Sequence, residues 1–192
     1  GMERAEAALA QALNETVGTL RLAAFQTAVL ALVPHALTDL EQQHPRLRVE
    51  VTELEPEIAL PALVAGEFDI VLGEEYPGHP LPRPRETERH DPLTDELRRI
   101  TPAAGSGRSR PTLASRPFVM EPVGTPAREW ATSVCRQAGF EPEVRYTSTD
   151  LQIHLRLVES GLAAALLPDL SGAGDRHDVV PHRLHGRPRR QI

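Results

Sequence analysis

Three threonines stand where an expected strand gives way to an expected helix: Thr27, Thr125 and Thr149. A threonine in this place can cap the helix, because its side-chain oxygen accepts a backbone N–H of the first turn. The same end of a helix carries free N–H groups and a partial positive charge, which is typical of anion sites. The three positions therefore predict a site for a small anion such as a carboxylate, although each threonine alone is also an ordinary structural cap.

Two adjacent carboxylates, Glu74 and Glu75, follow the third expected strand. A pair of carboxylates can perform acid–base chemistry. Neighbouring side chains on an extended chain point to opposite sides, however, so the two are not expected to share a substrate. A solvated loop is the simpler interpretation, and one glutamate pointing inward could accept a hydrogen bond from a ligand.

Other residue types that carry chemistry are few. Cys135 is the single cysteine and lies on the inward stripe of its expected helix, which predicts a buried, unreactive thiol. The sequence contains no lysine, so Schiff-base and Walker-type phosphate chemistry are excluded. His177, His182 and His185 are of a metal-ligating type, but their spacing matches no helical ligand pair. We expect no metal, no cofactor and no enzymatic activity.

The first half of the chain alternates between strand and helix patterns. Strands are expected at 19–24, 47–54 and 68–72, with helices at 27–43 and 57–65 between them. Gly66 ends the second helix, and Pro61 fits that helix only within its first turn. This order predicts a parallel sheet with right-handed crossovers.

A second alternation follows a proline-rich connector at 76–92. Its helices begin at Thr125-Pro126 and at Thr149, where Gln152 completes a capping box, and His154 is expected on a helix flank. Its strands are expected at 117–121, 143–147 and 162–167, with a further strand near 179–184. Residues 93–101 have apolar residues at helical spacing and stay ambiguous from pattern alone.

Composition restricts the function classes. The 192 residues carry a net charge of −6 and only 4% aromatic residues, which argues against nucleic-acid binding by this chain. No apolar run reaches the ~18 residues of a membrane span. Residues 1–13 lack the features of a secretory signal, so we expect a cytoplasmic protein without membrane contact.

Four segments carry a resemblance to a known family: residues 18–22, His44-Pro45, residues 65–69 and residues 158–168. With their surroundings they resemble the effector-binding domain of LysR-type transcriptional regulators over residues 3–184. The resemblance implies an α/β, type 2 periplasmic-binding-protein-like fold, with two Rossmann-like lobes joined by crossing strands. It implies that 93–101 is one of those crossing strands, because tertiary context overrides local propensity.

The resemblance also implies which residues line an inducer pocket between the lobes. These ligand-binding, non-catalytic positions are Phe25, Gln26, Thr27, Glu74, Thr101, Val123, Gly124, Thr125, Ser148, Thr149 and Asp150. The family usually has Ser or Thr directly after the first strand. Phe25-Gln26 stands there in this chain, so a bulky side chain narrows the expected pocket.

By the same resemblance, residues 3–16 are the end of a linker helix and residues 17–75 form lobe I. Residues 76–102 are the connector and crossing strand, 103–168 form lobe II, and 169–192 are a truncated return toward lobe I. In the family the linker helix leads from a winged helix-turn-helix, which this sequence does not include. DNA is therefore expected to be contacted only through that absent domain.

We thus expect the ligand-sensing domain of a LysR-type regulator, binding a small anionic inducer and forming a homodimer through the 28–43 helix and the 47–54 strand. Two alternatives stay open. A solute-binding protein of the same fold would need a secretory signal. A two-lobed enzyme such as a dehydratase would need a convergent acid–base pair, which the sequence does not show.

Overall fold

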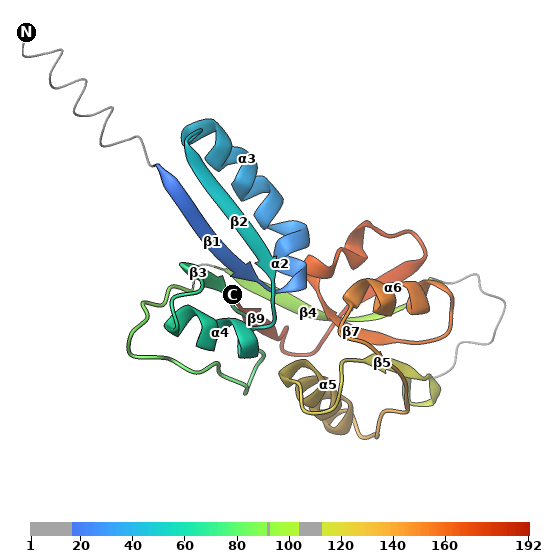
Figure 1. Cartoon of the computed structure of the whole chain (residues 1–192). Helices are drawn as coiled ribbons and strands as arrows, with labels where there is room; N and C mark the ends of the chain where they lie inside the picture. Colours follow the sequence, from blue (N-terminus) through green and yellow to red (C-terminus); the bar gives the residue numbers. More distant parts are fainter. Residues whose placement is uncertain (1–16, 92, 104–112) are drawn as a thin grey trace, which may run out of the picture. The chain divides into compact units, whose positions relative to one another are not determined.

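A computed structural model describes residues 17–91, 93–103 and 113–192 (Figure 1). The chain divides into two units, residues 1–73 and 74–192, each of which is described by itself. The expected linker helix at 3–16 lies outside the described residues, as do most residues of the loop expected at 102–111.

The first unit is built on a parallel sheet of three strands. The strands are β1 (Gly18–Ala24), β2 (Leu47–Glu53) and β3 (Ile70–Leu72), in the order β2-β1-β3. Leu22 of β1 pairs with Val51 on one side and Ile70 on the other. The β-α-β-α-β order and the parallel pairing predicted from the sequence are confirmed.

The helix expected over 27–43 is instead two helices, α2 (Gln26–Ala31) and α3 (Val33–Gln43). The break lies at Leu32, directly before the first turn of α3, which contains Pro34. Proline has no N–H to donate and its ring crowds the carbonyl of the preceding turn, so one continuous helix is interrupted here. The prediction of a single helix capped by Thr27 is therefore wrong.

The third helix, α4 (Pro56–Val64), contains Pro61 beyond its first turn, contrary to the sequence expectation. Because proline has no N–H, α4 lacks one intrahelical hydrogen bond at Pro61, and its nine residues still form a helix. Gly66 ends the helix as predicted, with a φ of 79°. The N–H of Glu67 donates to the carbonyl of Ala62 at 2.9 Å, the closing bond of a Schellman motif.

The second unit is organised around β4 (Thr94–Pro102), the strand that the family resemblance implied. It pairs antiparallel with β7 (Ala165–Pro168), β8 (Val179–Arg183) and β9 (Arg189–Gln191). Leu97 and Ile100 of β4 belong to two different hydrophobic clusters, one on each face of the sheet. Their helical spacing is therefore a consequence of a strand that is covered on both faces.

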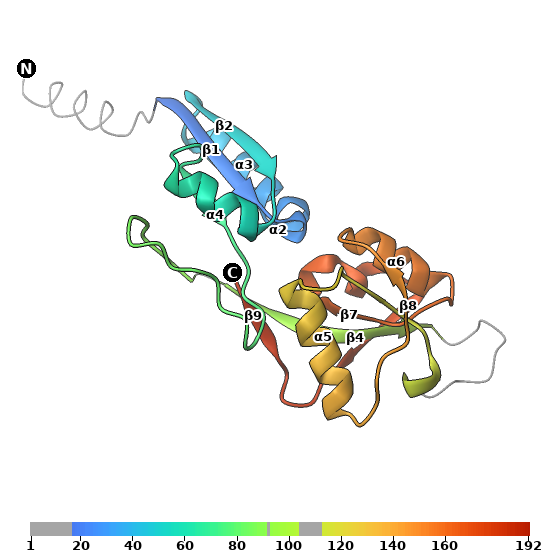
Figure 2. The same ribbon diagram turned by 60° about the horizontal axis from the view of Figure 1, so that its bottom comes forward.

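Two helices cover these two faces (Figure 2). The helix α5 (Pro126–Gln137) packs with Leu97 and Phe118, and α6 (Leu151–Glu159) packs with Ile100 and Val119. The parallel pair β5 (Phe118–Met120) and β6 (Val144–Thr147) extends the sheet, since Phe118 bridges to Ala164 beside β7. Short 3-10 turns occupy Leu113–Ser115, Asp169–Ser171 and Ala173–Asp175. Within the described residues, no helix combines the length and apolar character needed to cross a bilayer.

Candidate functional site

Two loops of the second unit lie side by side at the carboxyl ends of β5 and β6. Met120 pairs with Thr147 where these parallel strands end, and the N–H of Ser148 donates to the carbonyl of Met120 at 3.1 Å. Loop 121–125 leads into α5 and loop 148–150 leads into α6. Ligands of open α/β sheets bind outside the carboxyl ends of the strands, so this edge is the candidate site.

Loop 121–125 contains the helix cap that was predicted at Thr125. Its Oγ1 accepts the N–H of Arg128 at 3.2 Å and donates to the carbonyl of Pro122 at 2.9 Å. Gly124 has a φ of 90°, which other residues rarely adopt, and Val123 is 83% exposed. The Arg128 guanidinium donates to the carbonyl of Glu121 at 2.9 Å, so a cation lies beside this loop.

Loop 148–150 differs from the prediction in its cap. The cap of α6 is Asp150, whose Oδ1 accepts the N–H of Gln152 at 2.8 Å, whereas Thr149 is exposed. The capping box of Thr149 and Gln152 is therefore wrong. Since a carboxylate of the chain already occupies the first turn of α6, this helix end is a poorer anion site than expected.

His154 is buried rather than on a helix flank, with an exposed fraction of 2%. Its Nε2 lies 2.6 Å from the carbonyl oxygen of Ser148, and burial lowers the pKa of its imidazole. The signal was present in the sequence, because His154 falls on the same helical stripe as Leu151, Leu155 and Val158.

In the first unit, Phe25, Gln26 and Thr27 follow the carboxyl end of β1, as expected. Phe25 is the N-cap residue of α2 and makes no side-chain cap; it is 2% exposed. Thr27 is 1% exposed and is the second residue of α2, so it is not the N-cap. Of the three predicted threonine caps, only Thr125 is one.

Glu74 and Glu75 bind different arginines, in agreement with the opposite directions predicted for them. The Glu74 carboxylate pairs with Arg190. Glu75 binds Arg89 through both oxygens at 2.7 Å, which lowers the pKa of its carboxyl group.

Thr101 lies at the other end of the sheet from the two loops. Ile100, the residue before Thr101, pairs with Ala165 at the start of β7. Loops 121–125 and 148–150 follow the opposite, carboxyl ends of β5 and β6, which run parallel to β7. Its hydroxyl is 2.8 Å from Nε2 of His182. The structure therefore does not bring Thr101 together with loops 121–125 and 148–150.

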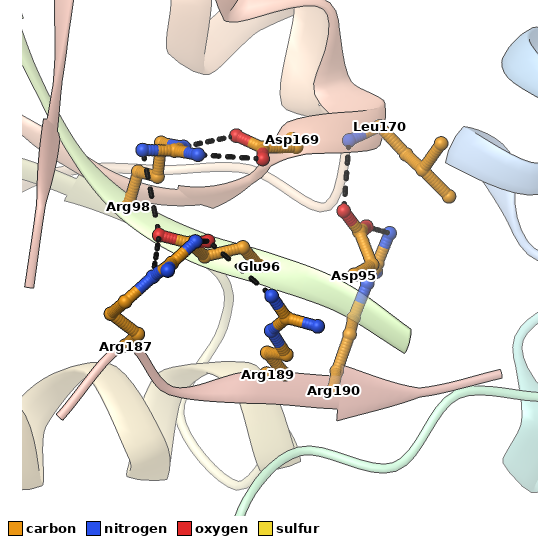
Figure 3. A network of polar contacts seen from close by, with 8 residues as sticks. All are labelled: Asp95, Glu96, Arg98, Asp169, Leu170, Arg187, Arg189 and Arg190. Carbon is orange, nitrogen blue, oxygen red and sulfur yellow. Dashed lines mark hydrogen bonds and ion pairs between the residues drawn. The ribbon is translucent and has the colours of Figure 1, made fainter. Parts of the chain in front are cut away.

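A network of charged side chains lies at the start of β4, with Asp95, Glu96 and Arg190 buried within it, and the sequence did not predict it (Figure 3). Arg190 of β9 is fully buried, and its guanidinium binds Asp95 at 2.8 and 3.0 Å. Burial raises the pKa of Asp95, and the field of Arg190 opposes that shift. The other Asp95 oxygen accepts the N–H of Leu170 at 3.2 Å, which joins this network to the end of β7.

A second branch of the network surrounds Glu96, which pairs with Arg98 at 3.5 Å and Arg187 at 2.8 Å. Arg98 also binds Asp169, at 3.1 Å from its Nη2. An open cavity of about 340 Å³ beside this branch is lined by Arg98, Asp169, Gly172, Gly174, Asp175 and Pro181. Because Arg98 is already paired, the cavity is a polar crevice of the network. The described residues hold no group of three His, Cys, Asp or Glu side chains suited to a metal ion.

These features define an α/β protein of the class that binds ligands outside the carboxyl ends of parallel strands. Residues 13–192 match the family model described as the LysR substrate binding domain. The chain therefore belongs to the family of LysR substrate-binding domains, which have the type 2 periplasmic-binding-protein-like fold.

Individual relatives agree with this assignment. The chain is 29% identical over 175 residues to the probable HTH-type transcriptional regulator LrrA of Synechococcus elongatus, covering 87% of this chain and 56% of the relative. The C-terminal domain of a probable LysR family regulator from Rhodococcus sp. RHA1 has a TM-score of 0.73 at 21% identity, with 92% and 89% of the two chains covered.

A structure of full-length CbnR complexed with its target DNA has a TM-score of 0.69 at 23% identity and covers 96% of this chain and 65% of that one. These structures support the fold. The chain spans about half the length of the curated relatives that it matches over most of its own length.

Proposed function

We propose that this domain senses a small molecule at a site formed in the second unit by loops 121–125 and 148–150. The observation that carries the proposal is the pairing of Met120 with Thr147, which puts two polar loops side by side at the carboxyl ends of parallel strands. Val123, 83% exposed in the first of these loops, offers an apolar contact.

An anionic inducer would be held near α5 rather than α6. The first turn of α6 already carries the Asp150 carboxylate, whereas the Arg128 guanidinium lies beside loop 121–125. Because the chain has no lysine, arginine is its only permanently cationic side chain. Thr101 is left out of this site because of its position at the other end of the sheet. Glu74 is assigned to the buried pair with Arg190.

A thermal-shift screen of small carboxylates and aromatic metabolites tests the proposal, since a ligand that binds the folded state raises its melting temperature. Val123→Asp should abolish the shift produced by a hit, because it places a carboxylate in the site. The matched control is Val180→Asp, an exposed valine of β8 that pairs with Thr101 at the other end of the sheet. Equal loss of the shift in both variants, or in neither, would exclude these loops as the site.

We further propose a regulatory rather than catalytic role in the cytoplasm, with DNA contacted by another part of the intact regulator. We propose self-association through α3 and β2, which lie within the 28–43 and 47–54 segments expected from the sequence to form the dimer surface. In the first unit's sheet β2 is an edge strand, with backbone groups available for a neighbour. Ala36 lies exposed on α3, where a second copy could pack.

Sedimentation at micromolar concentration tests this surface. We expect a dimer, and Ala36→Arg should convert it to a monomer while leaving the fold intact. Ala138→Arg, an equally exposed alanine in the second unit, is the matched control and should remain dimeric. A wild-type monomer, or a dimer unaffected by Ala36→Arg, would refute the proposed interface.

A further inference from the structure

A single histidine is enclosed in the core directly beneath loop 148–150. His154 projects from α6 and is 2% exposed. The neighbouring core on this face of the sheet is apolar and includes Leu151, Leu155 and Val158 from the same helix. Burial of a polar side chain in an apolar core destabilises the folded state unless its hydrogen bonds are satisfied.

The hydrogen bond of His154 fixes the tautomer of its ring. Nε2 lies 2.6 Å from the carbonyl oxygen of Ser148. A carbonyl oxygen can only accept, so Nε2 carries the proton and donates it. Nδ1 of the neutral ring is then an acceptor; it is enclosed and has no hydrogen-bond partner among the described residues. The one N–H donor of the neutral ring therefore binds the backbone of this loop.

We propose that His154 is the positioning residue of loop 148–150, and that effector binding depends on its neutral form. This inference rests on the proposed function in taking that loop as part of the site. Two side-chain hydrogen bonds of the loop are local: the Asp150 N–H donates to Ser148 Oγ at 3.0 Å, and the Gln152 N–H donates to Asp150 Oδ1 at 2.8 Å. His154 adds the bond that ties the Ser148 carbonyl to the buried face of α6.

Acid disrupts this arrangement for a geometric reason. A second proton must go to Nδ1, which is enclosed and has no acceptor within reach in the described part of the chain, so the charged ring has to turn or leave its place. Loop 148–150 then loses its bond to the His154 ring and keeps the bond from the Ser148 N–H to Met120. The effector site is thus intact while His154 is neutral and loosens as His154 gains a proton.

The surroundings offer little to stabilise a charged ring. Asp150 favours the protonated form through its field, but this effect is smaller than the cost of burial. Of the charged groups on β4, Arg98 binds Asp169, Glu96 pairs with Arg187, and Asp95 pairs with Arg190. β4 also carries Arg99, and β8 carries His182, 2.8 Å from the Thr101 hydroxyl, and Arg183, whose field acts on Glu96. On α6 itself, Glu159 binds Arg176. β5 and β7 contribute apolar residues to this core: Val119, Ala165 and Leu167.

Amide hydrogen exchange on the whole chain, followed by NMR without any ligand, tests the positioning role. His154→Leu keeps the bulk but cannot donate, so the amides of Ser148, Asp150 and Gln152 should exchange about tenfold faster. The amide of Arg128, bonded to the Thr125 cap of the neighbouring helix, is the internal control and should be unchanged. His154→Gln, which keeps a donor, should restore the slow exchange. Unchanged exchange in His154→Leu, or equal acceleration at Arg128, would overturn the proposal.

A pH titration of the same amide signals separates His154 from a merely structural residue. In the wild type, the signals of residues 148–152 should shift with the midpoint of the His154 ring, separately from any shift caused by protonation of Asp150, whose Oδ1 accepts the N–H of Gln152. In His154→Gln the shift at the His154 midpoint should be absent, whereas His177→Gln, at an exposed histidine, should leave it unchanged. An identical titration in His154→Gln would refute the pH coupling. Because no ligand is present, these results stand apart from the Val123→Asp test of the site itself.

Discussion

Arg190 of β9 and Asp95 of β4 form an ion pair inside the second unit. The Nε and Nη2 atoms of Arg190 lie 3.0 and 2.8 Å from the same Asp95 oxygen. Arg190 also pairs with Glu74 and stands 5.9 Å from the centre of the Tyr76 ring. One buried guanidinium therefore joins the start of β4, the last strand and the segment that opens the unit.

We expect Arg190→Met to lower the free energy of unfolding by about 3–5 kcal/mol, because it leaves two carboxylates without their cation. The large cost comes from the buried charge that remains, rather than from the net strength of the pair. Urea unfolding followed by fluorescence of Trp130, the single tryptophan and a residue of the same unit, measures it.

The control for this prediction is Arg136→Met, which removes an arginine whose pair with Glu141 is exposed on both sides. We expect no measurable change from it, since solvent-exposed ion pairs contribute little to stability. Similar losses from Arg136→Met and Arg190→Met would show that burial does not decide the effect.

The sequence alone could not reveal this pair. Arg190 is 95 residues from Asp95 and 116 from Glu74, and no local pattern links positions so far apart. The helical spacing of Leu97 and Ile100 was misleading for a related reason. Both faces of β4 are covered by other elements, so the strand does not show the usual alternation of apolar and polar residues. Features set by local chemistry were predictable, including the Thr125-Pro126 helix start and the turn at Gly66.

The candidate site was predictable in outline, because loops after parallel strands follow from the strand order. Its details depended on one-residue differences. Thr149 and Asp150 are both good caps, and only the position at which β6 ends decides between them. Thr101 was placed in the pocket by resemblance, and the pairing of its neighbour Ile100 with Ala165 puts it elsewhere.

Substitution of the cap residues tests whether Asp150, as in the structure, or Thr149, as predicted from the sequence, caps α6. Thr125→Ala and Asp150→Ala should each lower the free energy of unfolding by about 1 kcal/mol, because each removes an acceptor from a first-turn N–H. Thr149→Ala should be nearly neutral. Urea unfolding at pH 7 measures all three, and a larger loss from Thr149→Ala than from Asp150→Ala would reverse the assignment of the cap.

Acid should weaken the Glu75–Arg89 pair. The pKa of Glu75 is lowered chiefly by its hydrogen bonds to Arg89, so the unfolded chain takes up this proton at a higher pH than the folded one. The pair's stabilisation is present above the ordinary glutamate pKa of about 4.3 and is lost as the pH falls through the lower, folded value. Glu75→Gln should be less stable than the wild type at pH 6, and the difference should shrink toward pH 3.

The comparison needs a glutamate outside the pair. Glu88 is exposed, with an accessible side-chain fraction of 84%, and Glu88→Gln should differ little from the wild type at either pH. Trp130 fluorescence during urea unfolding measures each value. If the difference in unfolding free energy between the wild type and Glu75→Gln stayed constant with pH, Arg89 would not act through the charge of Glu75.

The thiol of Cys135 should be inert in the folded protein. It is 2% exposed on the inner face of α5, and burial raises its pKa to about 11. Because only the thiolate attacks a disulfide reagent, labelling at pH 8 should be at least about a hundredfold slower than in urea. Cys135→Ala combined with Ala138→Cys moves the thiol to an exposed position at the end of the same helix and should label at the unfolded rate without urea. Equal rates for the native thiol in buffer and in urea would instead require α5 to open readily, which its packing of Trp130 and Ala131 against Phe118 argues against.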